Sequence, residues 1–180
     1  MTGRGRDGLA NDASAAAFPE DFLDFIRALN AHAVEFMLVG GYAVGMYGHV
    51  RATTDIDFFY RCTTENVQRL MRAMAMFGAP AGLIDAKHLA MADAVTQLGA
   101  PPIRIDLLSS ISGVTFEEAA TDTVLVVIAG ETLPVIGIAA LRANKQATQR
   151  RKDREDLRNL PTTPEFGAST PGRKHRPGQA

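Results

Sequence analysis

The sequence has little of several features that would assign or exclude whole classes of protein. It contains one cysteine, Cys62, so no disulfide can form within the chain, which fits a reducing compartment. No apolar run approaches the roughly 18–20 residues of a membrane span. Residues 1–17 lack the apolar core of a signal peptide. These absences predict a cytoplasmic protein that has no membrane partner.

An excess of charge of one sign is also missing. Lys and Arg number 19 and Asp and Glu number 20, which leaves a formal net charge of −1. No overall positive field therefore attracts nucleic acid, although a local basic patch could still serve. The hydrophobic share of 46% and the charged share of 22% are ordinary for a globular protein with a real core. A length of 180 residues fits one domain.

Both ends of the chain differ in composition from the middle. Residues 1–17 are small and polar, and residues 161–180 are rich in Pro, Gly, Thr and basic residues. Such segments bury too little apolar surface to offset the entropy of ordering. We expect disordered segments at 1–17 and 161–180 and one domain over 18–160.

Helical and strand patterns alternate between these ends. The predicted helices are 19–33, 42–47, 65–77, 138–148 and 153–160, with a helical turn at 116–119. The predicted strands are 36–39, 55–60, 94–98, 103–108, 123–128 and 132–136. Turns that contain glycine join the last four strands into two pairs. This order predicts an α/β (α+β) fold in which a mixed β-sheet is flanked by helices.

The strand predicted at 55–60 carries the strongest chemical signal. Side chains alternate between the faces of a strand, so Asp55 and Asp57 point the same way while Ile56 and Phe58 point into the core. The two carboxylates repel each other, and a divalent cation such as Mg²⁺, which prefers carboxylate oxygens, would relieve that repulsion. The alternative is a pair of surface aspartates on an edge strand, because Asp-x-Asp is a short pattern.

A third carboxylate lies in the strand predicted at 103–108. Its apolar residues face one way, and Arg104 and Asp106 face the other. If this strand lies beside the first, Asp106 completes a two-metal site. Such a site steadies the attacking and the leaving oxygens of an in-line phosphoryl displacement.

Gly40 and Gly41 separate an apolar run from the start of a helix. Glycine permits close approach of the backbone, and free N–H groups at a helix N-terminus can bind an anion. A triphosphate could lie there, bridged by metal to the carboxylates. A tight turn without a ligand is the alternative. The pattern is neither G-x-G-x-x-G nor a P-loop with its lysine, so a Rossmann or P-loop interpretation is weak.

The ordered set of motifs resembles a known superfamily. Gly40-Gly41, thirteen intervening residues, Asp55-Ile56-Asp57 and a later Asp106 resemble the nucleotidyltransferases of DNA polymerase β type. Within that superfamily, the chain is similar to small AbiEii-toxin-like and DUF6036-like nucleotidyltransferases. The resemblance covers nearly all of residues 34–160, and its segments are 38–43, 51–57, 105–113 and 141–157.

The resemblance implies a nucleotidyltransferase enzyme whose active site has metal-binding aspartates and a phosphate-binding glycine turn. Such enzymes move a nucleoside monophosphate from an NTP, such as ATP, to a hydroxyl group, and pyrophosphate leaves. By this resemblance, Asp55 and Asp57 bind metal, and Asp106 binds one metal and acts as a base on the acceptor hydroxyl. Gly40 and Gly41 contact phosphate. Two Mg²⁺ ions are expected, with Mn²⁺ as an alternative.

The resemblance leaves the acceptor open. A tRNA end or other RNA, a protein side chain, and a small molecule such as an antibiotic all fit it. Some relatives are toxins or antitoxins of toxin–antitoxin pairs, so a cognate toxin or antitoxin is one expected partner. The small size leaves little room for an acceptor domain, so a partner or a homodimer could complete the site. The alternative function is a catalytically inactive module that binds a nucleotide or a partner, although no metal ligand is missing.

Three residues before the strand at 55–60 are expected to support the site. Arg51 either binds a phosphate or forms a structural ion pair, because arginine suits both. Thr53 and Thr54 are expected to orient Asp55, and Thr54 is counted with Arg51 among the nucleotide-binding residues.

The C-terminal helices offer further candidates. By the resemblance, Lys145 reaches the triphosphate and belongs to the nucleotide-binding set. Lys152 and Asp153 either lie near the site or form the solvated start of a helix, with Asp153 as its cap.

Overall fold

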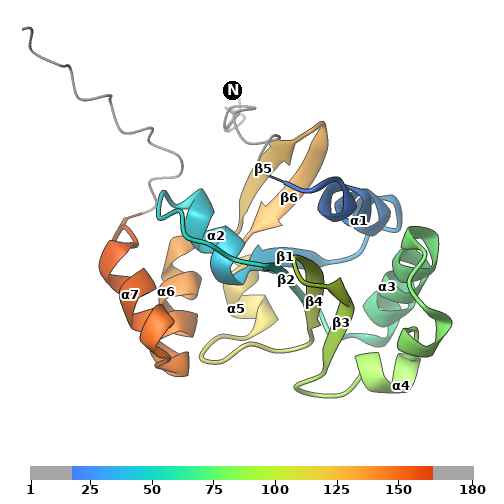
Figure 1. The fold of residues 1–180 in the computed structure, drawn as a ribbon. Coiled ribbons are helices and arrows are strands. Elements are labelled where there is room, and N and C mark those ends of the chain that lie inside the picture. The colour runs from blue at the N-terminus through green and yellow to red at the C-terminus, as the bar shows by residue number, and fades with distance from the viewer. Residues whose placement is uncertain (1–17, 164–180) are drawn as a thin grey trace, which may run out of the picture.

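The computed structural model describes residues 18–163 and shows a six-stranded mixed sheet with helices on both faces (Figure 1). The strand order is β3-β4-β2-β1-β6-β5. The strands are β1 (Phe36–Val39), β2 (Asp55–Tyr60), β3 (Val95–Ala100), β4 (Ile103–Leu108), β5 (Val124–Ile128) and β6 (Glu131–Val135). The pairs β2–β4 and β1–β6 are parallel, and the other three pairs are antiparallel.

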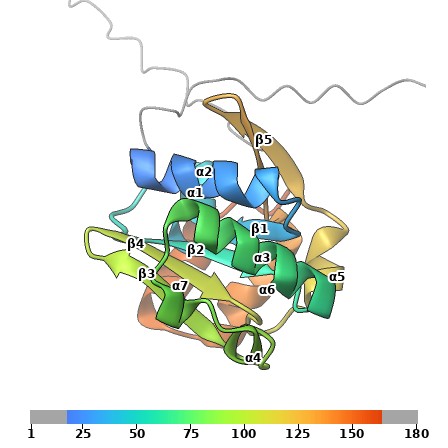
Figure 2. The ribbon, with the colours of Figure 1, turned by 90° about the vertical axis from the view of Figure 1, so that its right-hand side faces the viewer.

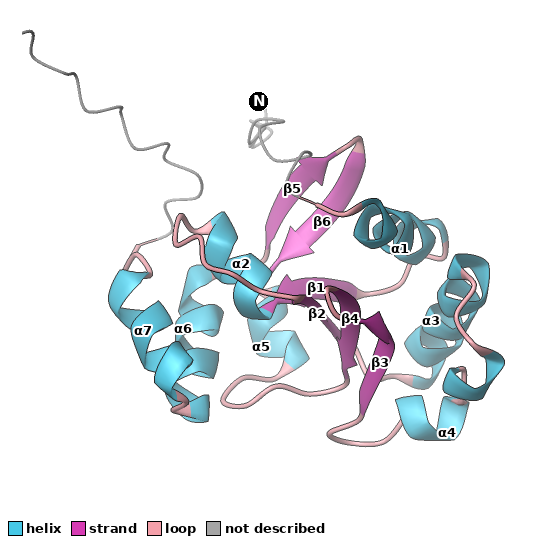
Figure 3. Ribbon diagram, in the orientation of Figure 1, coloured by secondary structure: helices cyan, strands magenta, loops and turns pink. Residues whose placement is uncertain are grey.

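Two layers of helices enclose this sheet. Helices α1 (Glu20–Ala31) and α3 (Thr64–Phe77) cover one face, and α6 (Ile138–Thr148) and α7 (Arg151–Asn159) lie on the opposite side, as two perpendicular views show (Figures 1 and 2). The shorter helices are α2 (Gly40–Met46), α4 (Ala86–Leu89) and α5 (Phe116–Ala120), with a 3-10 turn at Ala81–Leu83. The predicted fold, a mixed sheet flanked by helices, is confirmed (Figure 3).

Aromatic packing fixes the central strand β2 from the side of α1 and α3. Phe25 of α1 packs against Phe58 of β2 and Phe77 of α3, with ring centroids 5.8 and 5.0 Å apart. Phe58 is fully buried. Burial of large apolar side chains is the dominant favourable term in folding. It holds β2 in the orientation that turns Asp55 and Asp57 to the other face.

The register of the sheet decides which side chains share that other face. Parallel pairing of β2 and β4 places Asp55 opposite Arg104 and Asp57 opposite Asp106. Antiparallel pairing of β1 and β2 places the end of β1 opposite Asp57. The glycine turn that follows β1 therefore lies next to this carboxylate.

Several element boundaries differ from those predicted. Helix α2 begins at Gly40 rather than at residue 42, so the two glycines lie in its first turn. Helix α7 begins at Arg151 rather than at residue 153, and Arg150 is its N-cap. The short helix α4 was not predicted, because a single turn shows no periodicity. Its N-cap is Asp85, whose side chain accepts a hydrogen bond from the backbone N–H of Lys87.

In the described range, no helix is both long and apolar enough to cross a membrane. Residues 1–17 and 164–180, most of the two segments predicted to be disordered, lie outside the described residues. The predicted domain limits therefore stay predictions.

Candidate active site

A pocket of about 630 Å³ is lined by residues of the sheet and of the α6–α7 region. Its wall contains most of the residues that the sequence singled out, which are Gly40, Gly41, Arg51, Asp55, Asp57, Asp106 and Lys145. Thr54 does not line the pocket, whereas its neighbour Thr53 does. Residues up to about a hundred positions apart in the chain thus meet in one cavity, whose volume lies in the roughly 300–1,000 Å³ range of small-molecule sites.

Three carboxylates converge in this pocket. Asp55 and Asp57 of β2 and Asp106 of β4 each offer an oxygen, and these oxygens all lie within 4.8 Å of one another. Asp57 and Asp106 are direct neighbours on adjacent strands, an arrangement that is destabilising for like charges. A cluster of hard oxygen ligands that repel one another suits a divalent cation such as Mg²⁺ or Mn²⁺. The donor set therefore fits the expected metal.

Asp57 is buried next to two other carboxylates, which makes its negative charge costly. Burial raises its pKa, and the charges of Asp55 and Asp106 raise it further, to about 7. Lys145 and Lys152 act in the opposite direction and only partly offset these effects. Below about pH 7, Asp57 in the metal-free site thus holds a proton where a bound cation would supply positive charge.

The glycine turn is shaped around the same carboxylates. Gly40 has a φ of +67°, and a Cβ at this position would lie 1.9 Å from the Oδ2 atom of Asp57. A Cβ at Gly41 would lie 3.0 Å from the Oγ1 atom of Thr53 and 3.1 Å from the guanidinium of Arg51. Both positions therefore favour glycine, and Gly40 also needs it for its backbone conformation.

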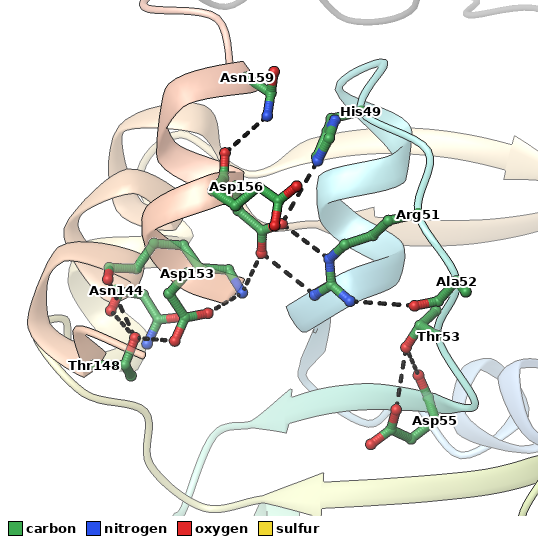
Figure 4. Close-up of polar contacts among 12 residues, drawn as sticks. His49, Arg51, Ala52, Thr53, Asp55, Asn144, Thr148, Asp153, Asp156 and Asn159 are labelled. Atoms are coloured by element: carbon green, nitrogen blue, oxygen red, sulfur yellow. Dashed lines mark hydrogen bonds and ion pairs between the residues drawn. The ribbon is translucent and has the colours of Figure 1, made fainter. Parts of the chain in front are cut away.

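Thr53 makes the contact that orients Asp55 (Figure 4). Its Oγ1 atom lies 3.1 Å from both the backbone oxygen and the Oδ1 atom of Asp55. Thr54 is exposed, and its side chain makes no hydrogen bond to any residue in 18–163.

A buried ion-pair network joins the loop before β2 to α6 and α7 (Figure 4). The Nζ atom of Lys145 lies 2.8 Å from Asp153 and 3.0 Å from Asp156. Asp156 also accepts hydrogen bonds from Nε and Nη2 of Arg51, at 2.9 and 3.3 Å. Arg51 thus forms an ion pair with Asp156, and its contact with a phosphate stays a prediction. Asp156 is fully buried, and its place in this network was not predicted.

The alternative that made Asp153 the cap of a solvated helix is wrong. Only 3% of Asp153 is exposed, and its carboxylate accepts hydrogen bonds from Lys145 and Thr148. Burial, the largest single effect, would raise its pKa, but these hydrogen bonds and the charges of Lys145 and Arg150 together outweigh burial, so the pKa is lowered. Asp153 and Asp156 lie three residues apart, which places them on one face of α7. That spacing was a usable sequence signal for a buried acidic pair.

Arg104 is a second residue whose contacts the sequence did not reveal. Its guanidinium lies between Asp55 and Asp106 and pairs with both at distances of 2.7–3.0 Å. Sequence alternation placed Arg104 on the same face as Asp106. The contact with Asp55 depends on the parallel register of β2 and β4, which local patterns do not specify.

Solved structures with a similar fold are nucleotidyltransferases. TM1012 from Thermotoga maritima, assigned as a nucleotidyltransferase, has a TM-score of 0.53 at 12% identity, over 86% of this chain and 97% of its own. LnuA, a lincosamide antibiotic adenylyltransferase solved with lincomycin bound, has a TM-score of 0.52 at 15% identity, over 79% of this chain and 96% of its own. At these identities the likeness shows a common fold. No curated protein matches the chain significantly.

The match to a sequence family covers most of the chain. Residues 19–166 match the family described as nucleotidyl transferase of unknown function (DUF2204). This range includes the glycine turn, the three aspartates and the α6–α7 network. The predicted superfamily is thereby confirmed, and the chain belongs to this family of nucleotidyltransferase enzymes.

Proposed function

We propose that the protein is a Mg²⁺-dependent enzyme that moves a nucleoside monophosphate from an NTP to a hydroxyl group. The observation that carries this proposal is the convergence of the Asp55, Asp57 and Asp106 oxygens within 4.8 Å. They lie in the wall of a pocket with a volume of about 630 Å³. The three carboxylates would hold the metal, with Mn²⁺ as a substitute for Mg²⁺.

In the proposed reaction, the acceptor oxygen forms a bond to the α-phosphorus, and the bond from that phosphorus to the bridging oxygen of the β-phosphate breaks. Pyrophosphate leaves with the bonding electrons. Asp106 takes the proton of the acceptor hydroxyl. The bound metal would supply positive charge to the attacking and the leaving oxygens.

Other residues of the pocket would position the nucleotide. Gly40 and Gly41 line the pocket next to Asp57, and both would contact the phosphates of the nucleotide. Lys145 and Arg51 line the pocket while Asp156 fixes their positions. Thr53 orients Asp55. Thr54 is exposed and does not line the pocket, so its proposed role is limited to a place beside the bound nucleotide.

The intact set of carboxylates argues against the alternative of an inactive binding module. A module of this fold that had lost catalysis would be expected to lack a metal ligand, whereas Asp55, Asp57 and Asp106 are all present. LnuA, a protein with a similar fold, adenylylates a lincosamide antibiotic, which makes a small molecule one acceptor class to test. Membership of a toxin–antitoxin pair and a homodimer stay predictions from the sequence.

The test is transfer of label from α-³²P NTPs. The purified protein is incubated with each NTP and MgCl₂, together with separate pools of tRNA, protein or small metabolites from a cell extract. Asp57→Asn is the test variant, because asparagine has nearly the shape of a protonated aspartate. Glu65→Gln, an exposed change on α3, is the matched control.

We expect label in one acceptor pool with wild type and Glu65→Gln, and its loss with Asp57→Asn or with EDTA. Labelled product that persists in the Asp57→Asn sample would contradict the proposed metal site. NTP binding without transfer to any pool would instead favour the binding module.

A further inference from the structure

Arg104 occupies a position that a metal ion would be expected to take. Its Nη2 atom lies 2.7 Å from Oδ2 of Asp55 and 3.0 Å from Oδ2 of Asp106, and its Nε atom lies 2.9 Å from Oδ1 of Asp106. The contact with Asp106 is a two-bond fork, the strongest form of an arginine–carboxylate pair. One cation thus joins two of the three carboxylates assigned to the metal.

The same oxygens cannot serve both cations equally well. The other oxygen of Asp55, Oδ1, accepts a hydrogen bond from the Oγ1 atom of Thr53 at 3.1 Å, and both oxygens of Asp106 accept hydrogen bonds from Arg104. A divalent ion among these carboxylates would also repel the guanidinium over a few ångströms in a partly buried site. Metal binding and the present position of Arg104 therefore oppose each other.

The guanidinium of Arg104 has space to move into the pocket. Its side chain is 26% exposed, and it lies in the wall of the large pocket. Its partner on the edge strand β3 is Gly99, which has no side chain to confine it. A modest rotation would move the guanidinium away from the carboxylates into the open pocket, where the proposed phosphates of the NTP would lie.

We propose that Arg104 is the counter-cation of the metal-free site, which holds Asp55 and Asp106 together and leaves them when a divalent ion binds. The inference rests on the proposed function, because it requires that the three aspartates bind metal. Arg104 makes no hydrogen bond or ion pair with Asp57 among the described residues, so Asp57 remains as the first carboxylate available to the ion. Arg104 would thus be a positioning residue that lowers metal affinity until a nucleotide offers the guanidinium other anionic partners.

The test measures binding of Mn²⁺ alone, followed by the electron paramagnetic resonance signal of the free ion. Arg104→Gln removes the guanidinium and keeps a polar side chain. Arg150→Gln is the matched control, because this substitution removes the same charge from the wall of the same pocket. In the described part of the chain, Arg150 makes no hydrogen bond to the three aspartates. Asp57→Asn reports whether Mn²⁺ binds at the carboxylates at all, and circular dichroism verifies that each variant is folded.

We expect Arg104→Gln to bind Mn²⁺ about tenfold more tightly than wild type, a common size for coupling between two ligands. Arg150→Gln is expected to change the affinity less than about twofold, as a screened surface charge would. In wild type, the Nε–Hε nuclear magnetic resonance signal of Arg104 is expected to move on addition of Mg²⁺, and it should stay in place in Asp57→Asn.

Two outcomes overturn the inference in distinguishable ways. If wild type binds Mn²⁺ but Arg104→Gln binds it no more tightly than Arg150→Gln, Arg104 does not compete with metal, while the proposed metal site stands. If wild type and Asp57→Asn bind Mn²⁺ equally, the carboxylates are not the metal site, and both proposals fail together.

Discussion

Gly40 meets two requirements that only a residue without a side chain meets. Its φ of +67° lies in the left-handed region, and a Cβ would lie 1.9 Å from the Oδ2 atom of Asp57. We expect Gly40→Ala to lose about 1–2 kcal/mol of stability through the backbone conformation. It should also displace the Asp57 carboxylate, so that Mn²⁺ binding and nucleotidyl transfer fall together. Urea denaturation and Mn²⁺ titration measure the two effects.

Gly130 offers a control that separates backbone strain from contact with the carboxylate. It lies in the turn between β5 and β6 with a φ of +81°, and a Cβ there would meet nothing within 4 Å. Gly130→Ala should therefore lose similar stability and keep full Mn²⁺ binding. Equal Mn²⁺ affinity in the two variants would contradict the role assigned to Gly40.

Asp57 should make stability depend on pH in the metal-free protein. Its pKa rises from 3.8 to about 7 on folding, through burial and then the charges of Asp55 and Asp106. The folded state therefore holds more protons than the unfolded chain in this range. The stabilising contribution of the proton is complete below about pH 4 and is lost as the pH rises through about 7. Asp57→Asn, which cannot ionise, should escape this loss.

The measurement is the free energy of unfolding in chelator, taken at pH 5 and pH 8. We expect Asp57→Asn to be more stable than wild type at pH 8, and the difference to shrink towards pH 5. The exposed change Glu65→Gln should follow wild type at both values. A difference between Asp57→Asn and wild type that does not vary with pH would show that Asp57 is ionised throughout.

The sequence predicted single residues well where their environment follows from local alternation. Asp55 and Asp57 share one face of β2 as predicted, and Ile56 is buried on the other face. It did not predict the pairing of Arg104 with Asp55, whose positions are 49 residues apart. That contact comes from strand register, which is set by packing of the whole sheet rather than by local pattern.

At the scale of elements, α6 and α7 act as one unit because buried charges join them. Asp156 of α7 is fully buried and lies 3.0 Å from Lys145 of α6 and 2.9 Å from Arg51 in the loop before β2. Removal of one partner from a buried ion pair leaves uncompensated charge and costs about 3–5 kcal/mol. We expect Asp156→Asn to lose stability near the lower end of that range, because the amide oxygen can still accept a hydrogen bond.

Glu155→Gln is the matched control for this change, since Glu155 is the exposed neighbour on the same helix. Surface substitutions of this kind change stability by within about 0.5 kcal/mol. Chemical denaturation of both variants gives the comparison. In addition, Asp156→Asn should raise the KM for NTP more than it lowers kcat, because Arg51 and Lys145 lose their fixed positions. Equal stability of the two variants would mean that the network contributes little to the fold.

The network also shows why α7 was misassigned at its start. The sequence of α7 is dominated by charged residues, so Asp153 was considered as a solvated cap. The charges of Asp153 and Asp156 are instead matched by Lys145 of the preceding helix. Charged residues are almost never fully buried unless they are paired, and the partner lies on another element. A pattern within one helix does not identify such a partner.

At the scale of the whole molecule, local patterns predicted the strands but not their order. Two hairpins, β3–β4 and β5–β6, were predicted because each is closed by a short turn. The sequence did not predict that β4 lies beside β2; the two-metal hypothesis only required it. It depends on a parallel pairing between strands far apart in the chain, which requires the complete sheet. The site exists because that pairing brings Asp106 to Asp57.

Metal binding should therefore stabilise the molecule as a whole, because the three carboxylates that would hold the ion come from both β2 and β4, and the glycine turn that follows β1 packs on Asp57. An ion that binds only the folded state at about 100 times its Kd adds roughly 2.7 kcal/mol of stability. We expect MgCl₂ to raise the Tm of wild type and of Glu65→Gln relative to EDTA, and to raise it much less for Asp57→Asn. NaCl at the same ionic strength controls for general screening of the charges. A rise in Tm with MgCl₂ of the same size in Asp57→Asn would place the ion elsewhere, since that variant lacks the carboxylate on which the proposed site depends.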